Sequence, residues 1–184
     1  MSQNSEVLAQ SWRWLEQVVI GLNLCPFAAK PHRNQQINMQ LSEAKNIDAL
    51  LDEVELALNH LNDTPASVLD TTVLVIPHLL QDFFDYNDAL DWVEDIIDQR
   101  EWRGVFQIAS FHPNYQFAGT APDDPENLTN RAPFPMFHLI REASMTRALA
   151  SYPDHESIPQ RNITKVESLT KQQRQQLFSY LYKE

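Results

Sequence analysis

Helical and strand patterns alternate along this chain, which predicts an α/β sandwich: a small, mainly parallel sheet of three to four strands with helices packed on it. Two observations carry this prediction. Stretches with apolar residues three and four positions apart alternate with short apolar or β-branched runs. One such run, TTVLVI at 71–76, is continuously apolar, as in a strand covered on both faces. At roughly 100–200 residues per domain, the 184 residues predict one domain over 1–184.

The first half of the chain has the clearest patterns. Residues 37–41 alternate between apolar and polar, as in a half-buried strand. Asn46 is expected to cap the helix that follows it. Apolar spacing predicts three helices in this half, at about 5–22, 46–61 and 82–100.

In the second half, residues 105–111 read as a strand, and Tyr115–Gly119 is a candidate for a short additional strand. Pro135 is expected to open a helix that runs to about Leu149. Residues 151–168 look irregular. Thr170 and Gln173 form a capping box for a last helix through Tyr182. A ferredoxin-like α+β sheet with antiparallel pairs is the alternative fold.

The ends of two predicted strands indicate where a site would lie. In open α/β sheets, ligands bind outside the carboxyl ends of the strands. His78 and His112 follow two such ends, so parallel strands would bring both to one edge as acid–base residues. The long segment 112–134 starts at the same edge, and ordered loops of that length are usually functional.

The helix expected after Pro135 supplies a second candidate pair. His138 and Glu142 lie four residues apart, so their side chains would meet on one helix face. They are catalytic candidates, and together with His78 and His112 they are also candidate ligands for zinc or iron. An exposed histidine beside a solvated Arg/Glu pair is the simpler interpretation.

Other side chains complete the candidate site. Arg131 and Arg141 can each bind a carboxylate or phosphate through a forked guanidinium, and Asn130 is a further candidate for substrate binding. Cys25 is either a nucleophile activated by a histidine or a small buried residue in an apolar turn.

Charge and composition exclude several classes of protein. The net charge is −11, which opposes binding to the phosphates of nucleic acids. The three glycines are too far apart for a phosphate cradle, so no nucleotide cofactor is expected. One cysteine allows no internal disulfide, and no apolar run approaches the length of about 20 residues that spans a membrane. We therefore expect a cytoplasmic protein.

The charge is concentrated in one part of the chain. Residues 42–103 contain 15 acidic and three basic residues. A solvated helix face is the simplest explanation. The alternative is a surface for a basic partner, with Trp102, Phe134 and Phe137 as exposed aromatic side chains.

Three segments of the chain resemble an uncharacterised family of bacterial and plastid proteins, catalogued only as a domain of unknown function. They are GLNLCPFA (21–28), TTVLVIPHLLQDFFDYN (71–87) and ASFHPNYQFAGTAPDDPENLTNRAPFPMFHLIREAS (109–144). The resemblance covers nearly the whole chain, and the last segment is long and specific. It implies a family identity but no activity and no residue role.

These patterns favour a small soluble enzyme that acts on a small anionic metabolite by His/Arg acid–base chemistry at the strand carboxyl edge. Two alternatives remain open. The first is a metalloprotein that uses His78, His112, His138 and Glu142. The second is a non-catalytic binding protein that uses the acidic 42–103 face.

Overall fold

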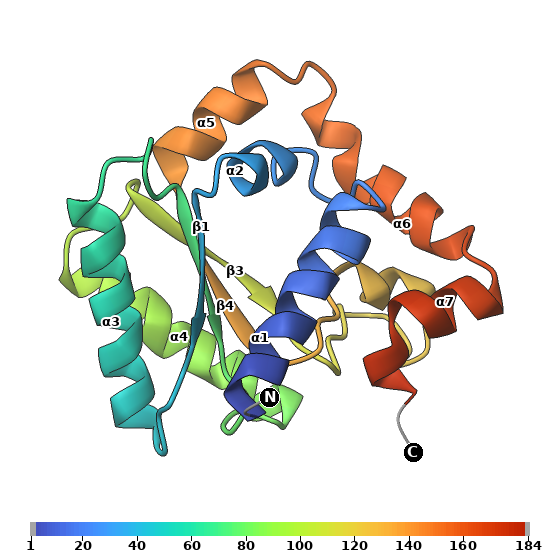
Figure 1. Ribbon diagram of the computed structural model, residues 1–184, viewed down its shortest axis with the longest axis horizontal. Coiled ribbons are helices and arrows are strands. Elements are labelled where there is room, and N and C mark those ends of the chain that lie inside the picture. The colour runs from blue at the N-terminus through green and yellow to red at the C-terminus, as the bar shows by residue number, and fades with distance from the viewer. Residues whose placement is uncertain (1–2, 183–184) are drawn as a thin grey trace.

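A computed structural model describes residues 3–182 and contains a four-stranded sheet in the order β1-β2-β4-β3 (Figure 1). Among the described residues the only parallel pair joins β1 and β2, whereas β4 runs antiparallel to both β2 and β3. The strands are β1 (Ile37–Leu41), β2 (Thr71–Val75), β3 (Phe106–Phe111) and β4 (Met136–Arg141). The protein is a mixed α/β domain. The expectation of a mainly parallel sheet is wrong, and the parallel β1–β2 pair also rules out an all-antiparallel ferredoxin-like sheet.

Strands β2 and β3 still end at the same edge of the sheet, as predicted for the strands before His78 and His112. Because β2 and β3 are both antiparallel to the strand between them, they point the same way, and their carboxyl ends lie at one edge of the sheet. The residues that follow them, including His78 and His112, therefore start from the same edge, which the parallel strand β1 also reaches.

Helices cover both faces of the sheet. Their bounds are α1 (Gln3–Trp14), α2 (Ala29–Arg33), α3 (Ile47–Asp63), α4 (Phe83–Gln99), α5 (Glu142–Ala150), α6 (Ile158–Glu167) and α7 (Lys171–Leu177). Shorter turns are a π-helix, η1 (Leu15–Ile20), and 3-10 helices η2 (Pro125–Thr129), η3 (His155–Ser157) and η4 (Ser179–Leu181). No helix within residues 3–182 is long and apolar enough to cross a membrane.

Two apolar cores lie on opposite faces of the sheet. Helices α3 and α4 cover one face, where they pack on Leu74, Phe137 and Leu139. Helix α1, η1 and the C-terminal helices cover the other face, above Met39, Val73 and Met136. Every residue of β2 is buried, as its continuous apolar sequence predicted.

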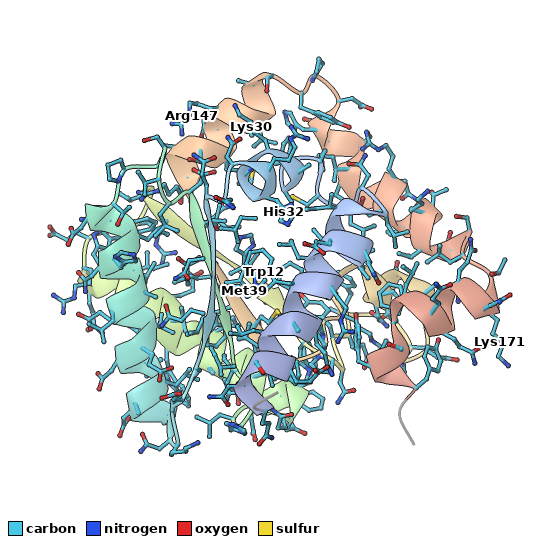
Figure 2. All side chains as sticks on the ribbon, in the orientation of Figure 1. Trp12, Lys30, His32, Met39, Arg147 and Lys171 are labelled. Carbon is cyan, nitrogen blue, oxygen red and sulfur yellow. The ribbon has the colours of Figure 1, made fainter. Side chains whose placement is uncertain are left out.

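The face under α1 is shown in Figure 2. The ring of Trp12 on α1 lies 5.9 Å from that of His32 on α2, and Met39 of β1 lies in the same region. A carboxylate oxygen of Glu16, on the π-helix, lies within hydrogen-bond distance of Nε2 of His32, at 3.2 Å. The π-helix ends at Gly21, where a Cβ would lie 2.3 Å from the carbonyl oxygen of Gln17, so this close approach requires glycine.

The prediction of a helix that starts at Pro135 is wrong for the first half of its range. Residues 136–141 form β4, and the helix begins only at Glu142. Both faces of β4 are covered, so its apolar residues do not alternate and mimic helical spacing instead. The fourth strand is therefore β4, and Tyr115–Gly119 forms no strand.

The C-terminal part is more regular than expected. Residues 158–167, expected to be irregular, form α6. The capping box predicted at Thr170 and Gln173 is confirmed, although α7 ends at Leu177 and a 3-10 turn follows. Asn46 caps α3 as predicted, with its side chain accepting from the amide of Ala49.

Candidate functional site

A pocket of about 290 Å³ lies at the carboxyl ends of β1 and β2. Its volume is at the lower limit of typical ligand pockets, which suits a small metabolite. This is the position where open sheets with parallel strands bind ligands. The lining residues are Asn4, Leu41, Ser42, Glu43, Lys45 and His78.

The β1–α3 loop provides half of this lining through Ser42, Glu43 and Lys45, and its backbone is fixed locally. Ser42 extends the parallel ladder by donating its amide to the carbonyl of Val75 at 2.8 Å. Its hydroxyl oxygen then accepts the amide of Ala44 at 3.3 Å. The loop thus turns sharply into α3 and leaves the side chains of Glu43 and Lys45 exposed at the pocket.

His78 is exposed and comes from the segment between β2 and α4. Leu80, two residues further on, adopts a positive φ of 55°. Its carbonyl oxygen accepts a hydrogen bond from Nε2 of His112 at 3.0 Å. The buried His112 therefore holds the segment that carries His78.

His112 is committed to this positioning role through both ring nitrogens. Nδ1 accepts the amide of Asn114 at 3.0 Å, so the ring proton must sit on Nε2, which donates to Leu80. Burial lowers the pKa of His112 and keeps the ring neutral. Neither nitrogen is left to exchange a proton with a ligand, so His78 is the one of the two predicted edge histidines that faces the pocket.

His138 lies elsewhere, in the middle of β4 between Val73 and Ala109. The Thr71 hydroxyl lies 2.6 Å from the carbonyl of Leu139 and donates to it, so Nε2–H of His138 donates to Thr71 Oγ1 at 2.7 Å. Burial lowers the pKa of His138 to about 4. The ring is therefore neutral at pH 7.

The predicted contact between His138 and Glu142 does not form. His138 lies within β4 and Glu142 follows its last residue, so extended strand and not a helix turn separates them, and four residues of strand span about 13 Å. Within residues 3–182 no three His, Cys, Asp or Glu side chains are grouped so as to hold a metal ion. The four metal candidates therefore do not converge.

The two arginines expected to bind substrate bind backbone carbonyls instead. Arg141 lies at the opposite edge of the sheet from His78, where its guanidinium donates to carbonyls of Leu61, Thr64 and Leu69. Arg131 donates to the carbonyls of Tyr115 and Pro122 within the 112–134 segment.

Asn130 and its neighbour Asn127 also stabilise the 112–134 segment. Asn130 donates to the carbonyl of Ser110 at 3.1 Å. The fully buried Asn127 accepts from Phe117 and Thr120 and donates to the carbonyl of Ala121. The segment is ordered, as expected, and its polar side chains are occupied in holding it together.

Cys25 lies in the turn between η1 and α2 and is half-buried. Burial raises the pKa of its thiol, which opposes formation of the nucleophilic thiolate. Within residues 3–182 no hydrogen bond joins it to a histidine. This environment favours the interpretation as a buried residue.

The aromatic side chains named for a binding surface are not exposed. Phe137 is fully buried in the core under α3 and α4, and Trp102 packs against the same core. Phe134 packs against the core under α1. The aromatic side chains that do face solvent on this side are Phe84 and Trp92, both on α4.

The sequence missed Lys45, Glu43 and Ser42, which share the pocket with His78. One signal could have found them. They lie between a predicted strand and a predicted N-cap at Asn46, and such strand-to-helix loops form the ligand edge of open sheets.

The fold and the pocket thus define a small mixed α/β protein with a metabolite-sized pocket at the carboxyl edge of its parallel strand pair. The chain belongs to DUF1415, a family of proteins of unknown function, whose family profile matches residues 6–176. No curated protein and no solved structure matches the chain.

Proposed function

We propose that the protein is an enzyme that acts on a small anionic metabolite in the pocket at the carboxyl ends of β1 and β2. His78 transfers a proton to or from the substrate, and the ammonium group of Lys45 binds its anionic group. The observation that carries this proposal is that a histidine and a lysine line one pocket at the ligand edge of a parallel strand pair.

We propose further that the substrate carries a second polar group. Glu43 lies in the same lining as Lys45, so the pocket offers a hydrogen-bond acceptor beside a cation. A carboxylate or phosphate that also carries a hydroxyl or amino group satisfies both. Lys45 thereby takes the role that was predicted for Arg131 and Arg141, whose guanidinium groups donate to backbone carbonyls.

A thermal-shift screen tests the binding part. The panel holds hydroxy acids, amino acids and sugar phosphates. A ligand at 100 times its Kd stabilises the folded state by about 2.7 kcal/mol. We expect at least one compound to raise Tm of the wild type, and Lys45→Met to abolish the rise. Lys30→Met on α2 and His60→Ala on α3 are matched controls outside the pocket and should retain it.

The catalytic part needs a separate readout. With the ligand identified, NMR follows its conversion by wild type and by His78→Gln. Glutamine preserves polarity but cannot transfer a proton, so we expect binding with loss of turnover. A panel that never stabilises the wild type, or a shift that survives Lys45→Met, contradicts the proposed site. Full turnover by His78→Gln contradicts the assigned role of the histidine.

A further inference from the structure

The outer face of α4 exposes two aromatic side chains to solvent. Phe84 is 77% exposed and Trp92 is 45% exposed. The inner face of the same helix is fully buried through Tyr86, Val93 and Ile97. Exposed apolar patches rimmed by polar residues mark sites of protein interaction, and tryptophan is enriched among the anchor residues of such sites.

These two side chains belong to one strip of the helix. Residues three and four positions apart share a helix face. The strip, called the α4 strip below, consists of Phe84, Asp88, Asp91, Trp92 and Asp95, all exposed. At a rise of 1.5 Å per residue, its two aromatic residues lie about 12 Å apart along the helix axis.

The aspartates of the α4 strip are not neutralised by the protein. Within residues 3–182 none of them forms an ion pair. The two nearest arginines along the chain are engaged elsewhere: Arg100 pairs with Glu55, and Arg103 pairs with Glu94 and Asp98. The strip therefore presents negative charge around its aromatic side chains.

The part of the chain that contains α4 has the same character. Residues 42–103 contain 15 acidic and three basic residues. Five of the six large apolar side chains exposed within residues 3–182 lie in this part of the chain or next to it: Leu56, Val68, Phe84, Trp92 and Val105. The excess of acid and the exposed apolar groups thus coincide.

We propose that the α4 strip binds a basic amphipathic helix of a partner protein. Phe84 and Trp92 contact apolar side chains that lie about two turns apart on the partner, and the three aspartates pair with its lysines or arginines. Charge excludes the other occupants. A second copy of this acidic strip, a nucleic acid and an anionic membrane surface would all be repelled.

Fluorescence anisotropy tests this proposal with a labelled 18-residue peptide of leucine and lysine, patterned as an amphipathic helix. We expect wild type to bind it, and Phe84→Ala/Trp92→Ala to weaken binding at least tenfold. The triple variant Asp88→Asn/Asp91→Asn/Asp95→Asn should also bind more weakly, and its affinity should change less between 50 and 200 mM NaCl. All substituted residues are exposed, so the variants should fold, which circular dichroism verifies.

Two controls separate this surface from general attraction between an acidic protein and a basic peptide. Asp48→Asn/Asp52→Asn/Asp63→Asn removes the same charge from exposed positions of α3 and should bind as wild type does. A peptide of the same composition without the amphipathic pattern should bind at least tenfold more weakly. Absence of wild-type binding, equal loss in the α3 variant, or unchanged affinity without the two aromatic residues overturns the proposal.

Discussion

The imidazole of His138 lies in the middle of β4, where it donates to the hydroxyl of Thr71 and burial lowers its pKa to about 4. In the unfolded chain the same group titrates near its ordinary value of 6.5. Between these two values the unfolded chain binds a proton that the folded protein does not. The contribution of His138 to stability is therefore complete above pH 6.5 and is lost as the pH falls toward 4.

We expect this loss to reach about 3 kcal/mol in the free energy of unfolding, since each pKa unit corresponds to about 1.4 kcal/mol. Urea unfolding at pH 7, 6, 5 and 4 measures it against His138→Gln, which retains a donor for Thr71 but cannot be protonated. Other groups titrate equally in both proteins. The variant should therefore lose less stability than wild type on acidification, and a constant difference between the two would refute the assignment.

The other two candidate histidines differ in their tertiary surroundings and not in their local sequence. His78 and His112 both follow a strand and both lie beside a proline, so their local sequences are alike. The neighbours that distinguish them, Leu80 for His112 and Lys45 for His78, come from other segments. The prediction that a site lies at this edge remains, with His78 facing the pocket and His112 supporting it.

Among the secondary-structure elements, the end of α3 depends on a residue far away in the chain. The guanidinium of Arg141, at the end of β4, donates to carbonyls at the last turn of α3 and in the α3–β2 connection. It also lies 6.0 Å above the ring of Phe106. These carbonyls have no helical partner, and a cation near a helix C-terminus is stabilising.

Arg141→Lys should destabilise the protein by about 2 kcal/mol, because a lysine cannot satisfy several carbonyls with a planar fork. Urea unfolding measures the change. Arg147→Lys is the matched control on α5, since that exposed arginine makes one bond, to the hydroxyl of Ser144, and should change stability by less than about 0.5 kcal/mol. Equal effects of the two substitutions would show that the fork of Arg141 is unimportant.

The elements that were predicted well share a simple property. Helices α3 and α4 each bury one side against the sheet, so their sequences show the helical period. The side chains of Asn46 and Asp82 cap these helices by accepting backbone amides two or three residues further on. Strand β4 is buried on both faces between two other strands, and this burial removes the alternation that would have identified it.

For the molecule as a whole, charge is divided between the two sides of the sheet. The part of the chain that contains α3 and α4 holds 15 acidic and three basic residues, while the rest is close to neutral. Like charges this close oppose the compact state, and salt screens them. The Debye length falls from about 30 Å at 0.01 M to about 10 Å at 0.1 M salt.

We therefore expect Tm to rise by about 2–4 °C between 10 and 100 mM NaCl, which for a domain of this size corresponds to about 1 kcal/mol. Calorimetry should show a smaller rise for Asp48→Asn/Asp52→Asn/Asp88→Asn. Neutralising three exposed acids in the balanced C-terminal part, Asp123, Glu156 and Glu167, should leave the response unchanged. The same response in all three proteins would contradict a local origin of the repulsion.

Short-range information in the chain is sufficient for the alternation of helices and strands, the caps at Asn46 and Thr170, the acidic segment and the edge at which the pocket lies. These features follow from period, turn chemistry and charge within about 20 consecutive residues. The strand order, the direction of β4, the carbonyls bound by Arg141 and the shared pocket of His78 and Lys45 depend on contacts between distant segments. Such contacts leave no local pattern, because each partner is compatible with many others until the chain has folded.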